Sequence, residues 1–372
     1  MKIAFIYDLM YPYSIGGIQT RNWEVARRLV RKGHQVTLFG VKQWVGSDVT
    51  HVEGVRLRGV GKPYALYSGG RRSVAGPVVF SMRLALPLLR GQFDIINVDN
   101  FPYFPCFPAK LASFLKRSKL VITWHEVWGD YWLEYLGWKG VFGKLIERVT
   151  GTLTDNMVAV SPGTADSLSR ITRGRRIQVI PNGVDCRSIQ ACQPSKESSD
   201  VIYCGRLTRE KNVELLVRAI GIAAERTRSL RCLIVGDGAE RDSLRRLSHS
   251  LNLDNNIVFK DYVPNQADLF SLMKSSRVFA LPSTREGFGI SLIEANACGL
   301  PAVTINHPRN EARSLITEGN GYLCEPTSQA MADAIARALN GGLGESSRAC
   351  AKGYDWDAIT DQLESFYAGR VS

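Results

Sequence analysis

Short apolar runs alternate with helical patterns along most of this 372-residue chain, and this alternation constrains the fold more than any other feature. The rhythm is clearest at the start, where apolar residues at helical spacing in 19–34 separate the apolar runs 2–7 and 35–40. Strand, helix and strand in this order predict a parallel sheet covered by helices. The strands expected in the first half are 2–7, 35–40, 94–99, 119–124 and 156–161.

The rhythm restarts after residues 186–200, "CRSIQACQPSKESSD", which are polar and unpatterned and are interpreted as a linker. The strands expected after it are 201–205, 231–236, 256–260 and 278–283, and the helices are 212–226, 240–251, 266–275 and one after Gly289. Because 372 residues are long for one core, we predict an α/β protein with two doubly wound Rossmann-like domains facing a cleft. The domains are expected at 1–190 and 200–353, followed by a last helix in 354–372.

The positive charge of the chain lies in its first half. Residues 1–190 hold 26 Lys and Arg against 13 Asp and Glu, whereas residues 191–372 hold 21 against 22. A basic domain implies an anionic partner, which is a nucleic acid, a phosphate-bearing substrate or an acidic membrane surface, unless the charge serves solubility alone. No nucleic-acid recognition motif is present, so charge alone supports that alternative.

Cysteine usage and hydropathy indicate a cytoplasmic protein. The eight cysteines form neither a CxxC pair nor a zinc-spaced cluster, which favours a reducing compartment. The apolar start of the chain is cut by Asp8 and predicts a buried strand rather than a signal peptide. The best candidate for a membrane span, 74–89, is interrupted by Arg83 and carries two prolines, so no span is expected.

The segment "TREGFGISLIEANACG" (284–299) carries two carboxylates in unusual places. Glu286 precedes a Gly-Phe-Gly turn, and the helix expected from Gly289 offers free N–H groups to a phosphate. Glu294 lies among apolar neighbours on that helix, where a carboxylate is costly without polar partners. About one and a half turns into the helix, Glu294 can reach ligand hydroxyls such as those of a ribose, and Glu286 would face what extends past the phosphates.

Three further sites follow expected strands. In "CGRLTREKN" (204–212), Arg206 and Lys211 suit a diphosphate, although cations are also common in surface loops. Gly16 and Gly17 lie between the first strand and the first helix, where the pair forms either a ligand site or only a turn. His125 follows the strand 119–124, so both a structural and a functional role stay open.

Taken together, these motifs resemble the retaining glycosyltransferases of the GT-B fold, in particular glycosyltransferase family 4, also called group 1. The resemblance covers nearly the whole chain. It rests on Gly16-Gly17, His125, "PNGVD" (181–185), "GRLTREKN" (205–212), "VGDGAERDSLRRL" (235–247), "YVP" (262–264) and "EGFGISLIEANACGLPAV" (286–303).

The resemblance implies a nucleotide-diphosphate-sugar as donor. Its diphosphate would be bound by the side chains and backbone of Arg206, Lys211, Phe288, Gly289, Ile290 and Ser291, with Gly16 and Gly17 beneath it. Glu294 would hold the ribose, and Val263 would contact the base. Glu286 and His125 would be the catalytic residues, the first on the donor sugar and the second near sugar and acceptor. The helix 355–367 would cross back to the first domain.

Two departures from the family pattern affect this reading. Asp261 stands where members of the family often carry Gly, which leaves the contact with the base open. Glu126 follows His125 where members often carry Asp, which leaves the contacts with the acceptor open. The chain lacks a DxD-type metal pair, so no metal is expected. The resemblance further implies front-face attack with retention, in which the leaving phosphate accepts the acceptor's proton.

The expected acceptor is a hydroxyl on a glycan or a lipid-linked molecule. The aromatic, proline-rich and basic segment 99–117 suits a membrane-borne acceptor and peripheral membrane contact, but it also suits an ordinary loop and core helix. Two alternatives remain at this stage: a nucleotide-sugar epimerase on the same scaffold, and a non-catalytic nucleotide-sugar-binding protein.

Overall fold

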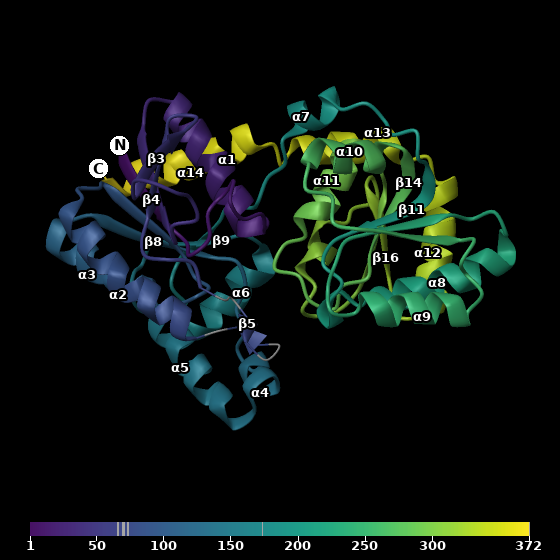
Figure 1. The fold of residues 1–372 in the computed structure, drawn as a ribbon, viewed down its shortest axis with the longest axis horizontal. Coiled ribbons are helices and arrows are strands. Elements are labelled where there is room, and N and C mark those ends of the chain that lie inside the picture. Colours follow the sequence, from purple (N-terminus) through teal and green to yellow (C-terminus); the bar gives the residue numbers. More distant parts are fainter. Residues whose placement is uncertain (65–66, 69–70, 73, 173, 372) are drawn as a thin grey trace. The chain divides into compact units, whose positions relative to one another are not determined.

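The computed structural model describes residues 1–64, 67–68, 71–72, 74–172 and 174–371 (Figure 1). The chain divides into two compact units. The first unit comprises Met1–Asn182 and Trp356–Ser372, and the second unit comprises Gly183–Asp355. Each unit is an α/β structure built on its own parallel sheet, as the alternating pattern predicted.

The first unit holds an eight-stranded sheet in the order β10-β9-β8-β7-β1-β2-β4-β3. Its strands are β1 (Lys2–Ile6), β2 (Gln35–Gly40), β3 (Val49–Val52), β4 (Val55–Gly59), β7 (Ile95–Asp99), β8 (Lys119–Trp124), β9 (Met157–Ala159) and β10 (Ile177–Val179). All neighbours are parallel except β3 and β4, an antiparallel edge pair that the sequence pattern did not reveal. The short strands β5 (Tyr67–Ser68) and β6 (Arg71–Arg72) pair separately.

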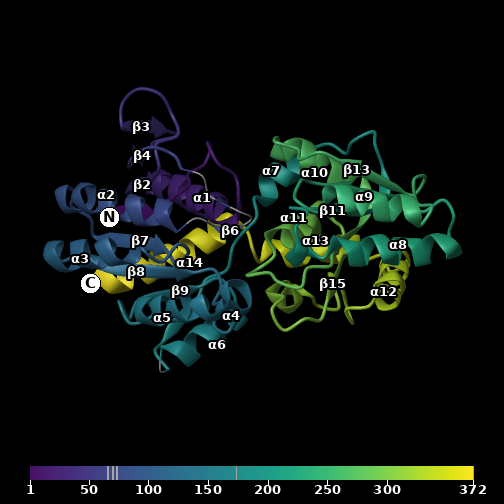
Figure 2. The same ribbon diagram turned by 60° about the horizontal axis from the view of Figure 1, so that its bottom comes forward.

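Helices cover both faces of this sheet (Figure 2). They are α1 (Gly17–Arg31), α2 (Ala75–Arg90), α3 (Cys106–Lys116), α4 (Tyr131–Leu136), α5 (Gly140–Thr150), α6 (Pro162–Ile171) and α14 (Trp356–Val371). Buried side chains of α2, α3, α4 and α6 form one core, and those of α1 and α14 form the other. The segment 74–89, the best candidate for a membrane span in the sequence, belongs to helix α2 and the residue before it. No helix of the described residues is long and apolar enough to cross a membrane.

Helix α14 packs in the first unit although it ends the chain. Its residues Trp356, Ile359, Leu363 and Tyr367 are buried against β1 and α1. Ion pairs tie the same two helices together, with 2.5 Å between Arg28 Nε and Asp357 Oδ1 and 2.6 Å between Lys32 Nζ and Asp361 Oδ1. The helix expected in 355–367 thus completes the core of the first unit, with Tyr367 fully buried and Phe366 at the edge of that core.

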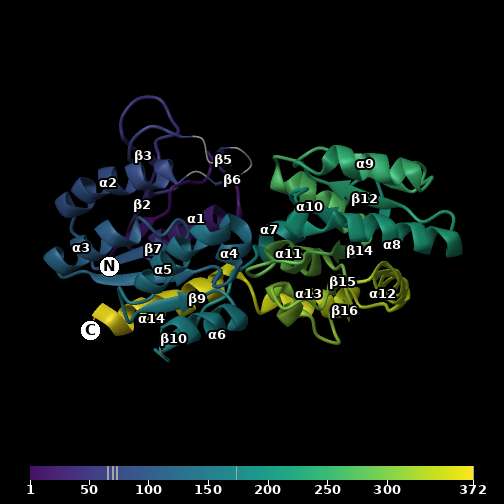
Figure 3. The same ribbon diagram turned by 90° about the horizontal axis from the view of Figure 1, so that it is seen from below.

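The second unit holds a six-stranded, all-parallel sheet in the order β13-β12-β11-β14-β15-β16. Its strands are β11 (Ser199–Cys204), β12 (Cys232–Val235), β13 (Ile257–Lys260), β14 (Ser276–Leu281), β15 (Ala302–Ile305) and β16 (Gly321–Cys324). Its helices are α7 (Cys186–Ala191), α8 (Val213–Arg226), α9 (Arg241–Ser250), α10 (Gln266–Lys274), α11 (Ile290–Cys298), α12 (Ser328–Asn340) and α13 (Gly344–Lys352). Helices α8, α9 and α12 cover one face, and α7, α10, α11 and α13 the other (Figures 1 and 3).

The segment 186–200 differs from the linker that its polar composition suggested. It contains α7, whose Ile189 is fully buried, and its last residues begin β11. Asp185 caps α7 by accepting a hydrogen bond from the Ser188 N–H at 2.9 Å. The division between the units falls earlier, between Asn182 and Gly183.

The strand order of each sheet reverses once, and the position of this reversal indicates where the candidate functional residues lie. In the first unit the order reverses between β1 and β7, and in the second unit between β11 and β14. Loops that follow two such strands diverge to opposite faces of the sheet and leave room for a ligand at the carboxyl ends. The candidate residues therefore have to be sought in the loops after these four strands.

Candidate active site

Lys211 and Glu286 meet at the reversal point of the second unit. Lys211 ends the short 3-10 helix η2 (Arg209–Lys211) after β11, and Glu286 lies in the loop after β14. Their Nζ and Oε1 atoms are 2.5 Å apart, and both side chains are largely buried. The same carboxylate oxygen accepts a hydrogen bond from the Ser283 hydroxyl at 2.8 Å.

Backbone hydrogen bonds hold these two loops in place. The Thr284 N–H donates to the Glu210 carbonyl at 2.9 Å, which joins the loop after β14 to the loop after β11. Glu286 itself pairs through its backbone with the loop after β15, since its N–H donates to Arg309 and its carbonyl accepts from Glu311, both at 3.0 Å. The ion pair is thus fixed by three adjacent strand ends, a preorganised arrangement for binding.

Gly289 begins helix α11 in a conformation that favours glycine. Its φ is 98°, and a Cβ there would lie 2.6 Å from the Cβ of Ala312. The helix starts without a side-chain cap, so Ile290 and Ser291 present N–H groups of the first turn. Phe288, by contrast, turns into the unit and packs edge-to-face on Tyr354, with 6.0 Å between the ring centroids. The ring of Phe288, one of the residues predicted to bind the donor, is therefore buried and not available to a ligand.

Glu294 is a carboxylate in apolar surroundings, as the sequence indicated. Burial raises the pKa of Glu294 to about 7. Its charge in turn adds to the raised pKa values of the thiols of Cys204 and Cys298, after burial as the main cause. Within the described part of the chain no group hydrogen-bonds or ion-pairs with this carboxylate, although its residue keeps some solvent exposure. A partly open, unpaired carboxylate is suited to ligand hydroxyls.

Arg206 lies on the same loop as Lys211 but extends toward solvent. Its side chain is 64% exposed and lies 4.0 Å from Glu210, while its carbonyl accepts a hydrogen bond from buried Tyr203 at 2.8 Å. The loop rests on Gly236 and Gly238, where a Cβ would come within 1.9 Å of the Gly205 carbonyl and 2.3 Å of the Leu207 carbonyl, respectively. The "VGDG" motif thus supports the Arg206 loop by close backbone packing.

The region proposed for a base contact is less defined. Val263 is partly buried in the loop before α10, and the departure from the family pattern at Asp261 is an exposed side chain paired with Arg241. This ion pair gives Asp261 a structural partner within the second unit.

His125 is part of a buried polar chain in the first unit. Its Nε2 lies 2.7 Å from Asp99 Oδ1, and the other oxygen of Asp99 accepts a hydrogen bond from Asn22 at 2.5 Å. Asp99 ends β7, and Asn22 lies on α1, so this chain crosses the point where the strand order reverses. The backbone N–H of His125 also donates a hydrogen bond to Oδ1 of Asn100 at 3.0 Å. A carboxylate that contacts one ring nitrogen fixes the orientation of the ring and leaves the other nitrogen for a ligand.

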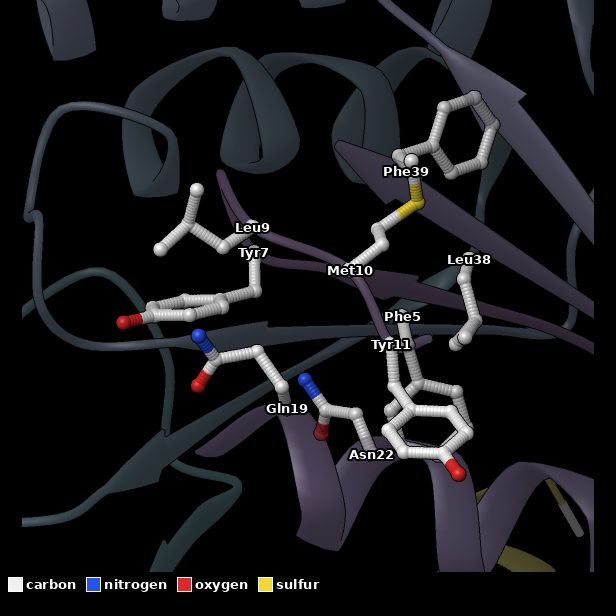
Figure 4. Close-up of a pocket in the computed structure, with 9 residues that line it drawn as sticks. All are labelled: Phe5, Tyr7, Leu9, Met10, Tyr11, Gln19, Asn22, Leu38 and Phe39. Carbon is white, nitrogen blue, oxygen red and sulfur yellow. The ribbon is translucent and has the colours of Figure 1, made fainter. Parts of the chain in front are cut away.

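Gly16 and Gly17 form the start of α1, and Gln19 and Asn22 of the same helix line a small cavity. Gly17 is the first helical residue, and a Cβ on Gly16 would lie 2.7 Å from Oε1 of Gln19. The cavity encloses about 10 Å³, which is room for about one water molecule. Figure 4 shows the amides of Gln19 and Asn22 reaching toward it from α1, beneath Tyr7. The cavity is therefore too small for a sugar or a nucleotide.

Two matches to known families cover nearly the whole chain. The family described as Glycosyltransferase Family 4 matches residues 15–188, and the family described as Glycosyl transferases group 1 matches residues 188–364. The chain belongs to the family 4 (group 1) glycosyltransferases. This confirms the family resemblance and identifies the protein as an enzyme.

Other proteins and solved structures resemble this glycosyltransferase at low sequence identity but over most of its length. A GDP-mannose:cellobiosyl-diphosphopolyprenol alpha-mannosyltransferase of Xanthomonas oryzae pv. oryzae is 25% identical over 83% of this chain and 79% of its own length. Sucrose-phosphate synthase from Thermosynechococcus elongatus superposes with a TM-score of 0.81 at 21% identity, covering 99% and 98% of the two chains. The Anabaena protein HepE in complex with UDP and glucose gives 0.75 at 20% identity, covering 99% and 100%. The two structures confirm the GT-B fold.

Two residues near His125 were not predicted from the sequence: Asp99, which contacts the ring, and Asn22, which contacts Asp99. Asp99 and Asn22 carry no motif of their own. A signal for Asp99 was present, because an apolar strand that ends in an acidic residue puts a carboxylate at the binding edge of a parallel sheet. No comparable signal marked Asn22, whose position about one and a half turns into α1 matters only once β1 and β7 are adjacent. Among the described residues, no cluster of three side chains suits a metal ion.

Proposed function

We propose that this glycosyltransferase moves a sugar from a nucleotide-diphosphate-sugar to a hydroxyl acceptor, with retention of the anomeric configuration and without a metal ion. The observation that carries the proposal is the fixed pair of Lys211 and Glu286 at the reversal point of the second sheet, beside the start of α11. Cations and free N–H groups next to a carboxylate suit a ligand that has both phosphates and sugar hydroxyls.

The donor would lie along the carboxyl ends of β11 and β14. Arg206, Lys211 and the N–H groups of residues 289–291 would bind its diphosphate, and Glu294 would accept hydrogen bonds from the ribose. Val263 would contact the base. The complex of HepE with UDP, and the GDP-mannose in the name of the Xanthomonas relative, support a nucleotide-linked donor. They do not decide which base the donor carries, so uracil, guanine and adenine all remain candidates.

Breakage of the sugar–phosphate bond places negative charge on the leaving diphosphate. Preorganised cations and helix N–H groups stabilise such charge more in the transition state than in the ground state. Glu286 would hold hydroxyls of the sugar, His125 would lie near sugar and acceptor, and Gly16 and Gly17 would give the diphosphate close access to the backbone of α1. Attack from the face of the leaving group, with the proton passing to the leaving phosphate, gives retention without a carboxylate nucleophile.

The acceptor is proposed to be a glycan or lipid-linked hydroxyl that binds the basic first unit. The Xanthomonas relative is named for a diphosphopolyprenol-linked acceptor, which supports this class. A contact between the first unit and a membrane surface would bring the enzyme to such a molecule.

The experiment is turnover of UDP-glucose, GDP-mannose and ADP-glucose in EDTA, with water as the default acceptor. We expect nucleoside diphosphate release from one donor, an initial sugar product of the donor's own α configuration by proton NMR, and loss of release in Glu286→Gln. Release of the β sugar would contradict retention. Conversion of the donor to an isomer with the nucleotide still attached would identify an epimerase instead.

A further inference from the structure

The outward faces of α2 and α3 carry apolar side chains where a surface helix usually carries polar ones. On α2, Val79, Met82 and Leu86 are exposed at helical spacing, with Met82 at 65%. On α3 the exposed side chains are those of Phe107, Leu111, Phe114 and Leu115, with Phe114 at 77%. The two helices lie side by side (Figures 1 and 3), so their apolar residues form one surface.

Helix α5 repeats the pattern on the same side of the sheet. Val141, Leu145 and Val149 are exposed at intervals of four residues, and Trp138 just before the helix is 73% exposed. A buried carboxylate fixes which side of α5 faces outward. Glu147 accepts hydrogen bonds from the Tyr103 hydroxyl at 2.7 Å and from the Trp128 and Gly129 N–H groups at 2.7 and 2.8 Å. The apolar stripe is therefore held toward solvent.

Apart from Glu147, the charged residues of these three helices are cations. They are Arg83 and Arg90 on α2, Lys110 and Lys116 on α3, and Lys144 and Arg148 on α5. Lys144 pairs with the exposed carboxylate of Asp130, which lies just before α4. Helices α2 and α3 contain no Asp or Glu, and the acidic residue of α5 is Glu147, which faces the core. We call the outward faces of these three helices the basic apolar face.

The second unit has no comparable surface in the part of the chain that the structure describes. Its exposed large apolar side chains are those of Leu251 after α9, Val258 on β13, Tyr262 in the loop after β13, and Leu323 on β16. Scattered apolar residues are ordinary on a protein surface, whereas a contiguous patch marks an interaction site.

We propose that the basic apolar face docks on a membrane that contains anionic lipids. Apolar side chains of helices lying in the plane of the interface insert at the boundary between headgroups and acyl chains, while neighbouring Lys and Arg attract the lipid phosphates. A second copy of this chain is a poorer occupant, because a two-fold contact would place the cationic face against itself. Docking through this face would keep the protein at the membrane surface and requires no spanning helix, in line with the absence of one among the described residues.

The test is flotation of the full chain with vesicles of phosphatidylcholine alone and with about 30% phosphatidylglycerol. Binding is expected only to the second kind, and it should weaken at least about tenfold between about 50 mM and about 500 mM NaCl. The pair Leu111→Ser and Phe114→Ser removes apolar contact, and Lys110→Gln with Lys116→Gln removes charge. Because all four side chains are exposed, the fold should tolerate both changes, and each should weaken binding about tenfold or more.

Matched changes in the second unit serve as controls. Val258→Ser with Leu323→Ser and the single change Arg246→Gln alter exposed residues of the same types away from this face and should bind as the wild type does. Lack of binding to anionic vesicles would overturn the proposal, as would unchanged binding of the two test variants. A dimer in solution that Leu111→Ser and Phe114→Ser dissociate, with no vesicle binding, would assign the face to a second copy instead. The assay needs neither donor nor acceptor, so its failure leaves the proposed transfer reaction untouched.

Discussion

The ammonium group of Lys211 and the carboxylate of Glu286 lie 2.5 Å apart, on loops that follow two adjacent strands, β11 and β14. Ser283 donates to the same carboxylate oxygen, and the backbone of Glu286 is bonded to a third loop. The pair therefore couples a cation suited to phosphate with a carboxylate suited to sugar hydroxyls at one fixed point. The donor-binding account of the second unit depends on this relationship.

Glu286→Gln should reduce donor turnover about 100-fold with little change in stability. Glutamine keeps the size of the side chain and accepts the bond from Ser283, but it loses the charge that Lys211 and the sugar hydroxyls contact. Steady-state rates and thermal unfolding measure the two effects. The control is Glu214→Gln, which removes an exposed carboxylate that pairs with Arg218 at 2.7 Å. Turnover near the wild-type rate in Glu286→Gln would exclude a direct role of the carboxylate.

Glu294 should make stability depend on pH. Its folded pKa of about 7 exceeds the ordinary value of 4.5, so between these values the folded protein binds a proton that the unfolded chain releases. Stability from this group is therefore fully present at low pH and is lost as pH rises toward 7. Glu294→Gln should be about 1–2 kcal/mol more stable than the wild type at pH 8 and equal to it at pH 4, by urea unfolding. The exposed change Glu318→Gln is the control, and an equal pH response of both variants would refute the assignment.

Asp99→Asn should lower kcat about 10-fold to 100-fold and leave nucleotide affinity unchanged. Asp99 is buried between Asn22 and His125, so its charge fixes the ring of His125 rather than contacting the donor nucleotide. Separate measurements of kcat and of nucleotide binding distinguish this positioning role from a general loss of structure. Asp155→Asn, at an exposed carboxylate paired with Arg175, should change neither quantity. A parallel loss of nucleotide affinity in Asp99→Asn would argue for unfolding instead.

Gly289→Ala should cost about 2–3 kcal/mol of stability and weaken nucleotide binding. The new methyl group would lie 2.6 Å from Ala312, in a backbone conformation with φ of 98°. Gly342→Ala separates the two causes, because Gly342 also has a positive φ but a Cβ there meets nothing within 4 Å. That control should cost about 1 kcal/mol and leave binding unchanged. Equal losses in both variants would show that crowding at α11 is unimportant.

Local patterns predicted most of the parallel strands, because buried strands of an α/β sheet are continuous apolar runs, but the parallel strands β10, β15 and β16 were not predicted. The runs 35–40 and 119–124 coincide with β2 and β8, and the helix expected after Gly289 is α11. The antiparallel pair β3 and β4 was missed, since its partly exposed residues alternate only weakly. The boundary of the units was also displaced, because polar composition hid the single buried residue, Ile189, that anchors α7.

The candidate site was predictable where one segment holds the whole feature and hidden where it depends on strand order. Glycine and glutamate spacing in 284–299 indicated an apolar environment for Glu294 and a helix start at Gly289. Asp99 and Asn22 are 77 residues apart and became recognisable only through the adjacency of β1 and β7. The direct contact between Lys211 and Glu286 was hidden for the same reason, because it depends on the strand order that puts β11 beside β14.

The most direct measurement is calorimetric binding of UDP, GDP and ADP to the wild type and to Lys211→Ala in the presence of EDTA. Arg218→Ala, at an exposed cation of the same unit, is the control. The account predicts that one of the three nucleotides binds to the wild type and to Arg218→Ala, and that Lys211→Ala weakens this binding at least about tenfold. Absence of binding by all three to the folded wild type, or equal binding by Lys211→Ala, would contradict a donor site at Lys211 and Glu286.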